Sequence, residues 1–581
     1  MSNKNVNKKR KNIKEKILNN NASKEVTLTK KENLKKDLIN FLIIFLLSLV
    51  YFLGVLDSDV IFDAHDLMFH TSNIITIERD LSLTNLIPNR ILPTLVNNLG
   101  YGVNLFYPNL PHMVGAYFYH FIGDIGLTIK ILFLVLINIS GIAMYKLIEK
   151  LFKNKEQALI TSLTYISMPY FFSDFFIRCA LNESFLFFII PIILLGIHYL
   201  IDDNNKIKFY LYFVLGYVLA INSHLVMSVY LTIILGIYLL VHRKKVFERK
   251  NLISFIIASI FIILLTLNFT VPLLEHNHLG IYNILNIEYK GARAVQTTNT
   301  FNYLLPIKHL DMPMYIPPLM TIILGYIFFK LKDIKKEHKN TLLGMYIILI
   351  FSIFLATNYR IWDYLPNIIK NIQFSWRMSL FVVIAVTIIF GYSINLLNKN
   401  LRKPFIILFI LIYIVTNSIN AKLIVNIYPE PEDYLITNEE HQWGKEYLPV
   451  VSVINIPDIR SKKLALTNSK TGAKIDIIDN SVPNMEFNVK NIKEELTIEF
   501  PRIYYLGYKL TDQDGKNYKL TMNNSGLIEA TISKDSKYKL EYTGTKLENS
   551  AYIISLLSYA FFLFYLIFLK YNKKRGVKDA K

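Results

Sequence analysis

Several features that assign a function to soluble proteins are absent from this chain. It has one cysteine, Cys179, in 581 residues, which excludes an internal disulfide framework and leaves the redox compartment open. It has no P-loop, no Gly-rich dinucleotide fingerprint and no Gly-x-Ser-x-Gly turn. The first 36 residues also lack the apolar core and small-residue cleavage site of a signal peptide.

Acidic residues are few compared with basic ones: 44 Asp and Glu stand against 64 Lys and Arg, a formal net charge of +20. This excess does not indicate nucleic-acid binding, because the basic residues lie in short segments between apolar runs, as in cytoplasmic loops. Hydrophobic residues make up 52% of the chain, aromatic residues 14%, and the mean hydropathy is +0.33. This composition predicts a polytopic membrane protein.

About twelve apolar runs are candidates for transmembrane helices at a rise of 1.5 Å per residue. They are residues 38–56, 126–146, 157–172, 184–201, 209–223, 225–242, 252–271, 314–331, 341–357, 378–397, 404–419 and 550–570. With the N-terminus inside, alternation places the Lys- and Arg-rich breaks on the cytoplasmic side. Counting 105–122 as a further span would invert the later loops, so we expect an interfacial or re-entrant segment there.

The order of these segments predicts five parts. Alternating apolar residues around Tyr518 and Tyr538, together with the turn signal Asp514-Gly515, indicate strands in the long polar region near the C-terminus. We therefore expect a mainly α, polytopic membrane protein with an extracytoplasmic C-terminal β-rich domain. The expected parts are a basic disordered cytoplasmic tail (1–37), a transmembrane domain (38–419) with a large first extracytoplasmic loop (57–125), the β-rich domain (420–549), a last transmembrane helix (550–570) and a cytoplasmic tail (571–581).

The first loop contains the densest group of titratable residues. Asp66 and His70 are four residues apart, so a helix would place them on one face. Such a pair is typical of a general base, a metal-ligand pair, or a base with its orienting partner. The alternative is a loop helix whose polar residues only face water. Asp63 and His65 are further candidates.

Arginines near other outer helix ends suit an anionic ligand. Arg178 lies in the short loop 173–183 with Asp174 and Glu183, and a guanidinium group offers a planar fork of donors to phosphate. The alternatives are an ion pair with one of these carboxylates, or an arginine that reaches lipid headgroups. Arg377 follows Trp376 before another span and is open to a headgroup-binding interpretation as well.

His224 ends another run on the same side of the membrane. A histidine at a helix end is more often a cap than a ligand, and both interpretations stay open.

These motifs resemble a known family when taken in order. They are Asp66-Leu67-Met68-Phe69-His70, Gly100-Tyr101-Gly102, Phe106-Tyr107-Pro108, Pro169-Tyr170, Arg178-Cys179-Ala180-Leu181-Asn182-Glu183, His224, Trp376-Arg377 and, near the C-terminus, Tyr504-Tyr505-Leu506-Gly507-Tyr508. The pattern is similar to the bacterial multi-pass membrane proteins labelled 6-pyruvoyl-tetrahydropterin-synthase-related, to YfhO-like proteins and to the wider GT-C glycosyltransferase superfamily. Ala64 departs from the pattern, in which glycine is more common.

The resemblance implies a GT-C-like fold with a catalytic aspartate at Asp66. The expected reaction is an inverting transfer of a sugar from a polyprenyl-phosphate donor to a cell-envelope glycan or polymer on the extracytoplasmic face of a bacterial plasma membrane. His70 would orient Asp66 or contact the phosphate, and Arg178 or Arg377 would stabilise the leaving phosphate. The expected substrate-binding residues are Arg178, Glu183, His224, Arg377, Tyr101 and Tyr107.

No metal ligand is assigned, and a divalent metal is allowed but not required. Besides the lipid-linked sugar and the glycan acceptor, the expected partners are membrane lipids, without nucleic acid. Two other functions stay open: a transporter or flippase for a lipid-linked glycan, and a non-catalytic assembly factor of the cell envelope. Transporters place their ionisable groups near the membrane midplane on repeated, broken helices, and no clear repeat is visible here.

Overall fold

The computed structural model describes residues 30–53, 64–82, 87–93, 96, 98–285, 313–366, 369, 374–396, 399–423, 445–454, 465–466 and 472–578. The chain forms two compact units, Met1–Leu47 and Ser48–Lys581. In the first unit the described part is helical and belongs to α2 (Lys30–Ser48). The expectation of a disordered tail up to residue 37 is therefore wrong from Lys30 onward.

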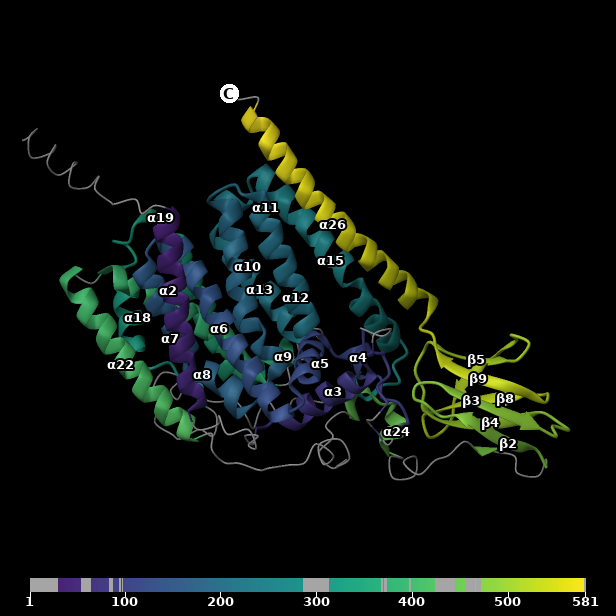
Figure 1. Ribbon diagram of the computed structural model, residues 1–581. Coiled ribbons are helices and arrows are strands. Elements are labelled where there is room, and N and C mark those ends of the chain that lie inside the picture. The colour runs from purple at the N-terminus through teal and green to yellow at the C-terminus, as the bar shows by residue number, and fades with distance from the viewer. Residues whose placement is uncertain are drawn as a thin grey trace, which may run out of the picture. The chain divides into compact units, whose positions relative to one another are not determined.

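The second unit contains all the other described helices. They are η1 Leu49–Phe52, α3 Leu67–Asp80, α4 Val103–Phe106, α5 Leu110–Ile122, α6 Ile125–Phe152, α7 Lys155–Ile166, α8 Pro169–Phe172, η2 Ser173–Ile177, α9 Leu181–Ser184, α10 Leu186–Ile201, α11 Lys206–Phe209, η3 Tyr210–Val214, α12 Leu215–Ser223, α13 Leu225–Val241, α14 Arg243–Val246, α15 Arg249–His278, η4 Asn283–Leu285, α18 Pro318–Lys330, α19 Lys336–Thr357, η5 Tyr359–Tyr364, η6 Ser375–Met378, α21 Ser379–Ser393, η7 Ile394–Leu396, α22 Lys399–Leu423, η9 Lys445–Tyr447, α24 Val450–Ile454 and α26 Lys546–Lys578. Helices α6, α7, α10, α12 and α13 run side by side in Figure 1.

Within the described residues, seven helices are long and apolar enough to cross a membrane. They are Ile125–Phe152, Leu181–Ile201, Arg249–His278, Lys336–Thr357, Ser375–Ser393, Asn400–Ile419 and Lys546–Asn572. Each coincides with an expected run, and two shorter apolar helices, α13 and α18, coincide with two more. The run 157–172 is built from α7 and α8, and the run 209–223 from the last residue of α11, η3 and α12. The chain is a multi-pass, mainly helical membrane protein.

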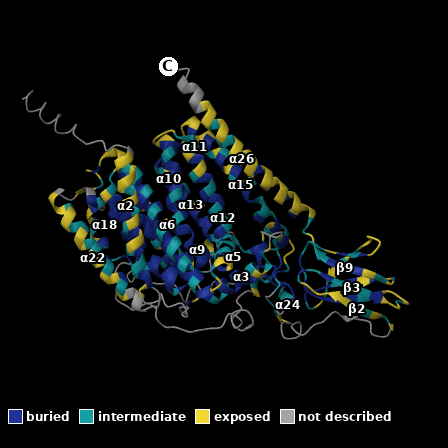
Figure 2. Ribbon diagram, in the orientation of Figure 1, coloured by how far each residue is buried: buried dark blue, intermediate teal, exposed yellow. Residues whose placement is uncertain are grey.

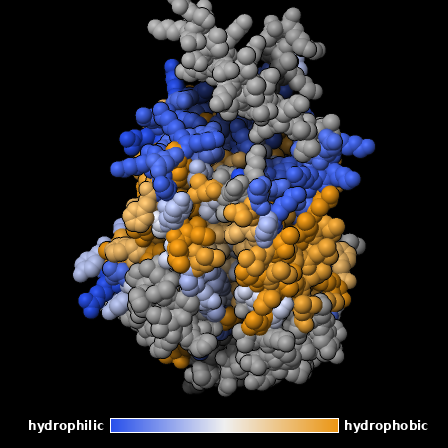
Figure 3. Space-filling view, turned by 90° about the vertical axis from the view of Figure 1, so that its left-hand side faces the viewer, coloured by the Kyte–Doolittle hydropathy of each residue, from blue (hydrophilic) through white to orange (hydrophobic). Residues whose placement is uncertain are grey.

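Burial separates the inner helices from the outer ones. Figure 2 shows α10 largely buried, whereas α22 and α26 expose many side chains. The exposed side chains of α18 and α22 are mostly large and apolar, including Ile322, Phe329, Ile407 and Leu411. Figure 3 shows a broad hydrophobic band on the side that carries these helices, with hydrophilic residues above it. This arrangement is expected where lipid replaces water as the solvent.

The segment 105–122 does not form one helix. The short α4 ends at Phe106, and α5 begins at Leu110 with Pro111 in its first turn, where a missing N–H is tolerated. At 1.5 Å per residue the 13 residues of α5 cover about 20 Å, less than the hydrocarbon core of a bilayer. Helix α5 packs against α3 and α6. The interfacial position of this segment stays a prediction.

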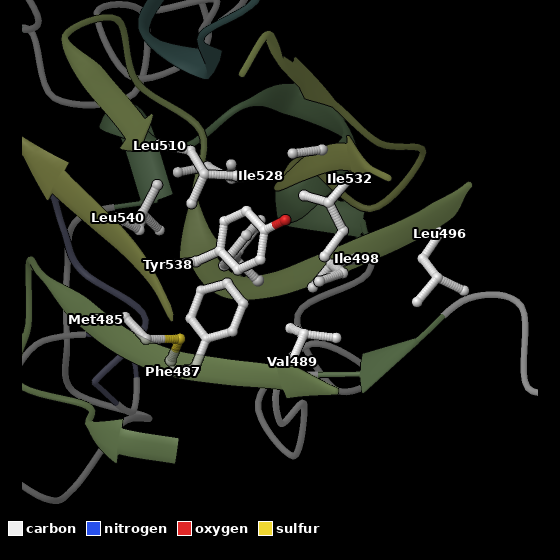
Figure 4. Packing of buried hydrophobic residues seen from close by; sticks show 12 residues of the cluster. Met485, Phe487, Val489, Leu496, Ile498, Leu510, Ile528, Ile532, Tyr538 and Leu540 are labelled. Carbon is white, nitrogen blue, oxygen red and sulfur yellow. The ribbon is translucent and has the colours of Figure 1, made fainter. Parts of the chain in front are cut away.

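A two-sheet region follows the helices. One sheet has the order β1-β4-β8-β7 and the other β2-β3-β9-β5-β6, and every described pairing is antiparallel. The strands are β1 Ala465–Leu466, β2 Lys474–Asp479, β3 Met485–Lys490, β4 Leu496–Ile503, β5 Tyr508–Asp512, β6 Asn517–Tyr518, β7 Leu520–Met522, β8 Leu527–Ile532 and β9 Ser536–Tyr542. Alternate residues of β3 and β9 point inward and meet those of β4 and β8, as Figure 4 shows for Phe487, Tyr538 and Ile498. The predicted β-rich region is confirmed.

A partly buried ion pair joins this region to the helices. Arg90 Nε contacts Glu548 Oε1 at 3.1 Å in the first turn of α26, directly after β9. Arg90 Nη2 also donates to the carbonyl of Asn268 at 2.6 Å, four residues before Pro272 inside α15. Tyr542 donates to the other Glu548 oxygen at 3.0 Å. One arginine therefore holds the first loop, α15 and the end of the β region together.

Candidate active site

The segment after α7 forms an irregular turn that directs charged side chains inward. Pro169 begins α8, and the chain then widens into the π-helical turn η2 before Arg178. Cys179 has a φ of 53°, a left-handed conformation that few residues other than glycine adopt, and α9 begins two residues later. π-Helical turns and backbone outliers of this kind are concentrated at functional sites.

Arg178 is the centre of this turn and is 3% exposed. Its Nη1 donates to Asp174 Oδ1 and, at 2.9 Å, to Glu183 Oε2, and both carboxylates are buried. Its Nη2 lies 3.2 Å from Asp66 Oδ2. The ring of Trp376 covers the guanidinium group, with 4.4 Å between the ring centroid and Cζ. The ion-pair interpretation of Arg178 is the one that the structure supports, with three carboxylates rather than one.

Asp66 is the exposed member of this network. It is the N-cap residue of α3, and its side chain is 41% exposed while those of Asp174 and Glu183 are almost fully buried. The backbone holds it in place, because the Asp66 amide donates to the Arg178 carbonyl at 2.7 Å. The neighbouring His65 amide donates to the Ile177 carbonyl at 3.2 Å. The aspartate and the arginine predicted from distant motifs are thus in direct contact.

A second arginine approaches the same carboxylates. Arg377 Nε lies 3.4 Å from Glu183 Oε2, and its side chain is 14% exposed. Tyr170 donates to the other Glu183 oxygen at 2.6 Å, so both oxygens of this buried carboxylate have partners. Counting only the described part of the chain, Arg377 has fewer close polar contacts than Arg178, which leaves more of its donors for an incoming anion.

His70 lies on the first turn of α3 but contacts a residue other than the one expected. Its Nδ1 is 2.8 Å from Nε2 of His112 on α5, and both rings are buried. The charged neighbour of Asp66 is Arg178. His70 meets Asp66 through its backbone, where the His70 amide donates to the Asp66 carbonyl at 3.1 Å. Phe69 and Tyr107 pack against His112, with ring centroids 5.8 and 5.9 Å away.

Two of the remaining predicted residues, His224 and Tyr107, lie close enough to the ion network to interact with its charges. His224 caps α13, where its ring accepts from the Met227 amide at 3.3 Å. This is the cap of the two interpretations given for it above. Tyr101 is buried, with its backbone paired to Leu92 and its ring 6.0 Å from that of Tyr447. Tyr107 packs against Phe69 beside the site. Asp63 lies outside the described residues.

Burial acts on the charges of this network. Burial, followed by the charge of Glu183, raises the pKa of the Asp174 carboxyl well above its usual range, while Arg178 opposes the rise. Asp174 Oδ2 has no hydrogen-bond partner among the described residues. The carboxylates thus depend on Arg178 for their charge compensation.

Sequence reasoning did not include His112 and Trp376 among the site residues. His112 follows Pro111 in the segment assigned to the interface, and a lone histidine beside aromatic residues carries no spacing signal. The position of Trp376 beside Arg377 at the start of a span gives no sign that its ring covers Arg178.

A divalent metal does not fit the residues that the structure describes. Among them, no group of three His, Cys, Asp or Glu side chains could hold a metal ion. The three carboxylates already converge on the guanidinium of Arg178, so a cation occupies their common centre.

The two buried histidines predict an acid-sensitive fold. Burial, followed by the charge of Arg178, lowers the pKa of His70 from 6.5 to about 3, and burial and His70 lower the pKa of His112. The unfolded chain therefore binds more protons below pH 6.5, and the free energy of unfolding falls as the pH drops from 6.5 towards 3. In detergent, we expect the apparent Tm of wild type to fall over this window and that of His112→Gln to fall less steeply.

His120→Gln is the matched control, because His120 lies on the same helix with an exposed ring. Parallel curves for wild type and His112→Gln would contradict the assignment of the acid sensitivity to this pair.

Comparison with known proteins gives only distant similarity. No family model and no curated protein matches the chain. Among solved structures, the arabinofuranosyltransferase AftD from Mycobacteria aligns with a TM-score of 0.45 and 13% identity over 68% of this chain and 28% of its own. An oligosaccharyltransferase from Archaeoglobus fulgidus has a TM-score of 0.41 and 12% identity, covering 67% of this chain and 55% of its own.

A third structure, ArnT from Cupriavidus metallidurans bound to undecaprenyl phosphate, has a TM-score of 0.40 and 13% identity over 73% of this chain and 71% of its own. This chain thus spans less than two thirds of the first two proteins. At these similarities the function rests on the residues of the site.

Proposed function

We propose that this protein is a GT-C-like membrane glycosyltransferase that uses a polyprenyl-phosphate-linked sugar on the extracytoplasmic face. The acceptor is a cell-envelope glycan or polymer in a bacterial plasma membrane. The more specific YfhO-like assignment stays a prediction.

The observation that supports the proposal best is the position of Asp66. Its partly exposed carboxylate stands at the edge of a buried ion network, and its backbone amide is fixed by Arg178. Figure 1 shows α3, α5 and α9 together at one end of the long helices, opposite the basic helix α11. A carboxylate held rigidly at the end of apolar helices suits proton transfer at a membrane surface.

In this reaction the acceptor oxygen attacks the anomeric carbon while the bond from that carbon to the phosphate oxygen breaks. Asp66 takes the proton of the acceptor hydroxyl, and the departing lipid phosphate carries away the bonding electrons. Arg377 stabilises the developing negative charge, because its guanidinium has more donors left than that of Arg178. Arg178 instead positions Asp66, and Glu183 orients Arg377.

The transporter and assembly-factor alternatives are less well supported by this geometry. The charged residues of the site gather at the ends of helices α3, α9 and α21 rather than halfway along them. A non-catalytic scaffold gives no reason for one exposed carboxylate to join a network of buried charges.

The proposal is tested with wild-type protein reconstituted in vesicles that contain undecaprenyl-phosphate sugars with radiolabelled hexose or pentose. An isolated cell-envelope glycan is added outside. We expect the label to leave the lipid fraction and appear in the glycan fraction. Labelled lipid that crosses the bilayer without transfer would favour the transporter. Label that stays in the donor leaflet with both the hexose and the pentose donors would favour the scaffold.

A further inference from the structure

Four aromatic rings from distant parts of the chain pack together between the helices and the β region. We call Phe106, Tyr282, Tyr447 and Tyr505 the junction cluster. Tyr505, which follows β4, stacks on Tyr282 with 5.6 Å between centroids and 7° between planes. Tyr447 stacks on Phe106 at 5.5 Å and 9°. The four side chains are nearly or fully buried, so the cluster is a packed joint rather than a pocket.

The β region fits closely against the Gly100-Tyr101-Gly102 motif. The Ile503 amide donates to the Leu99 carbonyl at 2.9 Å, and Tyr505 donates to the Tyr447 carbonyl at 3.0 Å. A Cβ atom on Gly102 would lie 2.7 and 2.8 Å from two ring atoms of Tyr505, closer than carbon atoms can approach. Gly102 has a φ of −81°, so space and not backbone strain requires glycine here.

The joint continues to the turn that carries Asp66. Tyr447 lies 6.4 Å from Tyr107, and Tyr107 meets the ring of Phe69 edge-on at 5.4 Å. Phe69 is in the first turn of α3, whose N-cap residue is Asp66. Next to Tyr107, the Pro108 carbonyl accepts from Asn182, the neighbour of Glu183. The junction cluster therefore reaches both sides of the ion network.

We propose that docking of the β region through the junction cluster orders the first turn of α3 and thereby places Asp66. Tyr447 and Tyr505 are positioning residues in this scheme, and the Gly-Tyr-Gly motif is a docking site for the β region rather than a sugar-binding loop. The effect on sugar transfer rests on the proposed function. The effect on the order of the first turn of α3 does not depend on the proposed function.

The test is amide hydrogen exchange of the full chain in detergent, compared between wild type and Gly102→Ala. The added methyl group forces Tyr505 away, so we expect amides in residues 64–71 to exchange about tenfold faster or more, together with those of 99–108. Gly236→Ala is the matched control, because a Cβ there meets nothing within 4 Å, and it should leave both segments unchanged. Tyr505→Leu, which removes the ring without adding atoms to the loop, should act like Gly102→Ala.

Exchange in the β3 and β4 amides, read in the same experiment, shows whether each variant folds. Faster exchange in 99–108 with unchanged exchange in 64–71 overturns the proposal, as does unchanged exchange in both. A variant whose β3 and β4 amides also lose protection is replaced by Tyr505→Phe, which keeps the ring and loses the hydroxyl with its bonds to the Tyr447 carbonyl and the Gly102 backbone. For Tyr505→Phe, amide exchange in residues 64–71 that is faster than in wild type, by less than in Gly102→Ala, supports the proposal, and unchanged exchange there overturns it.

No substrate is needed for the exchange measurement, so it stands or falls separately from the transfer assay. If transfer occurs, Gly102→Ala should lower kcat for the undecaprenyl-phosphate sugar and leave KM nearly unchanged, because the turn is misplaced but the arginines remain.

Discussion

Asp66→Asn is expected to reduce sugar transfer by on the order of 10²–10⁴-fold, the range by which a positioned general base contributes. Asparagine has nearly the same shape, and its amide oxygen still accepts from Arg178, but it cannot take the acceptor proton. The substitution also leaves in place the hydrogen bond from the backbone amide of residue 66 to the Arg178 carbonyl. Initial rates at saturating donor, measured in the vesicle assay, give the change in kcat.

Glu78→Gln is the control for this substitution. Glu78 lies on the same helix, is partly exposed and pairs with His120 rather than with the ion network. It makes the same change of a carboxylate to an amide, and we expect transfer within about twofold of wild type, because surface substitutions of this kind have small effects. Equal rates for Asp66→Asn and wild type would remove Asp66 from its proposed role.

Arg178→Met is expected to cause the largest loss of stability in the chain. The substitution leaves Asp174 and Glu183 buried without their main positive partner, and breaking a buried ion pair in this way costs about 3–5 kcal/mol. It also removes the cation that stacks on Trp376. Thermal unfolding in detergent should show a strongly reduced apparent Tm or no folded protein.

Two further variants show whether charge is the cause. Arg360→Met removes an exposed arginine in η5 and should leave the apparent Tm nearly unchanged. The triple change Arg178→Met, Asp174→Asn and Glu183→Gln removes the uncompensated carboxylates and should recover part of the lost stability. If the triple variant is no more stable than Arg178→Met, packing around Trp376 and not charge carries the effect.

The helical part of the fold follows closely from local pattern. Runs of apolar residues predict the long helices. A segment that spans a membrane must pair its backbone polar groups within itself, and its side chains must be apolar where they face lipid or other helices. Details at the ends were less predictable: α2 begins at Lys30 and α26 at Lys546, since charged residues extend a helix as readily as apolar ones. The strands around Tyr518 and Tyr538 were visible as alternation, but their pairing across two sheets was not.

The site shows the same division. Asp66, Arg178 and Glu183 could be selected because charges at the ends of apolar runs are costly. Their mutual contact could not, because Asp66 and Arg178 are 112 residues apart and meet only through tertiary packing. The pairing of His70 with His112 and the contact of Tyr505 with Gly102 are likewise long-range. The first of them replaces the side-chain partner that spacing suggested for His70.

Pro272 within α15 has a consequence beyond a bend in the helix. A proline has no amide hydrogen, so the carbonyl of Asn268, one turn earlier, is left without its helical donor. Arg90 supplies that donor from another part of the chain. Pro272 thus leaves one backbone carbonyl of a membrane helix available as an acceptor, and this acceptor fixes where Arg90 binds. Restoring the amide with Pro272→Ala would return the helical donor to this oxygen, which would then no longer depend on Arg90 for a partner.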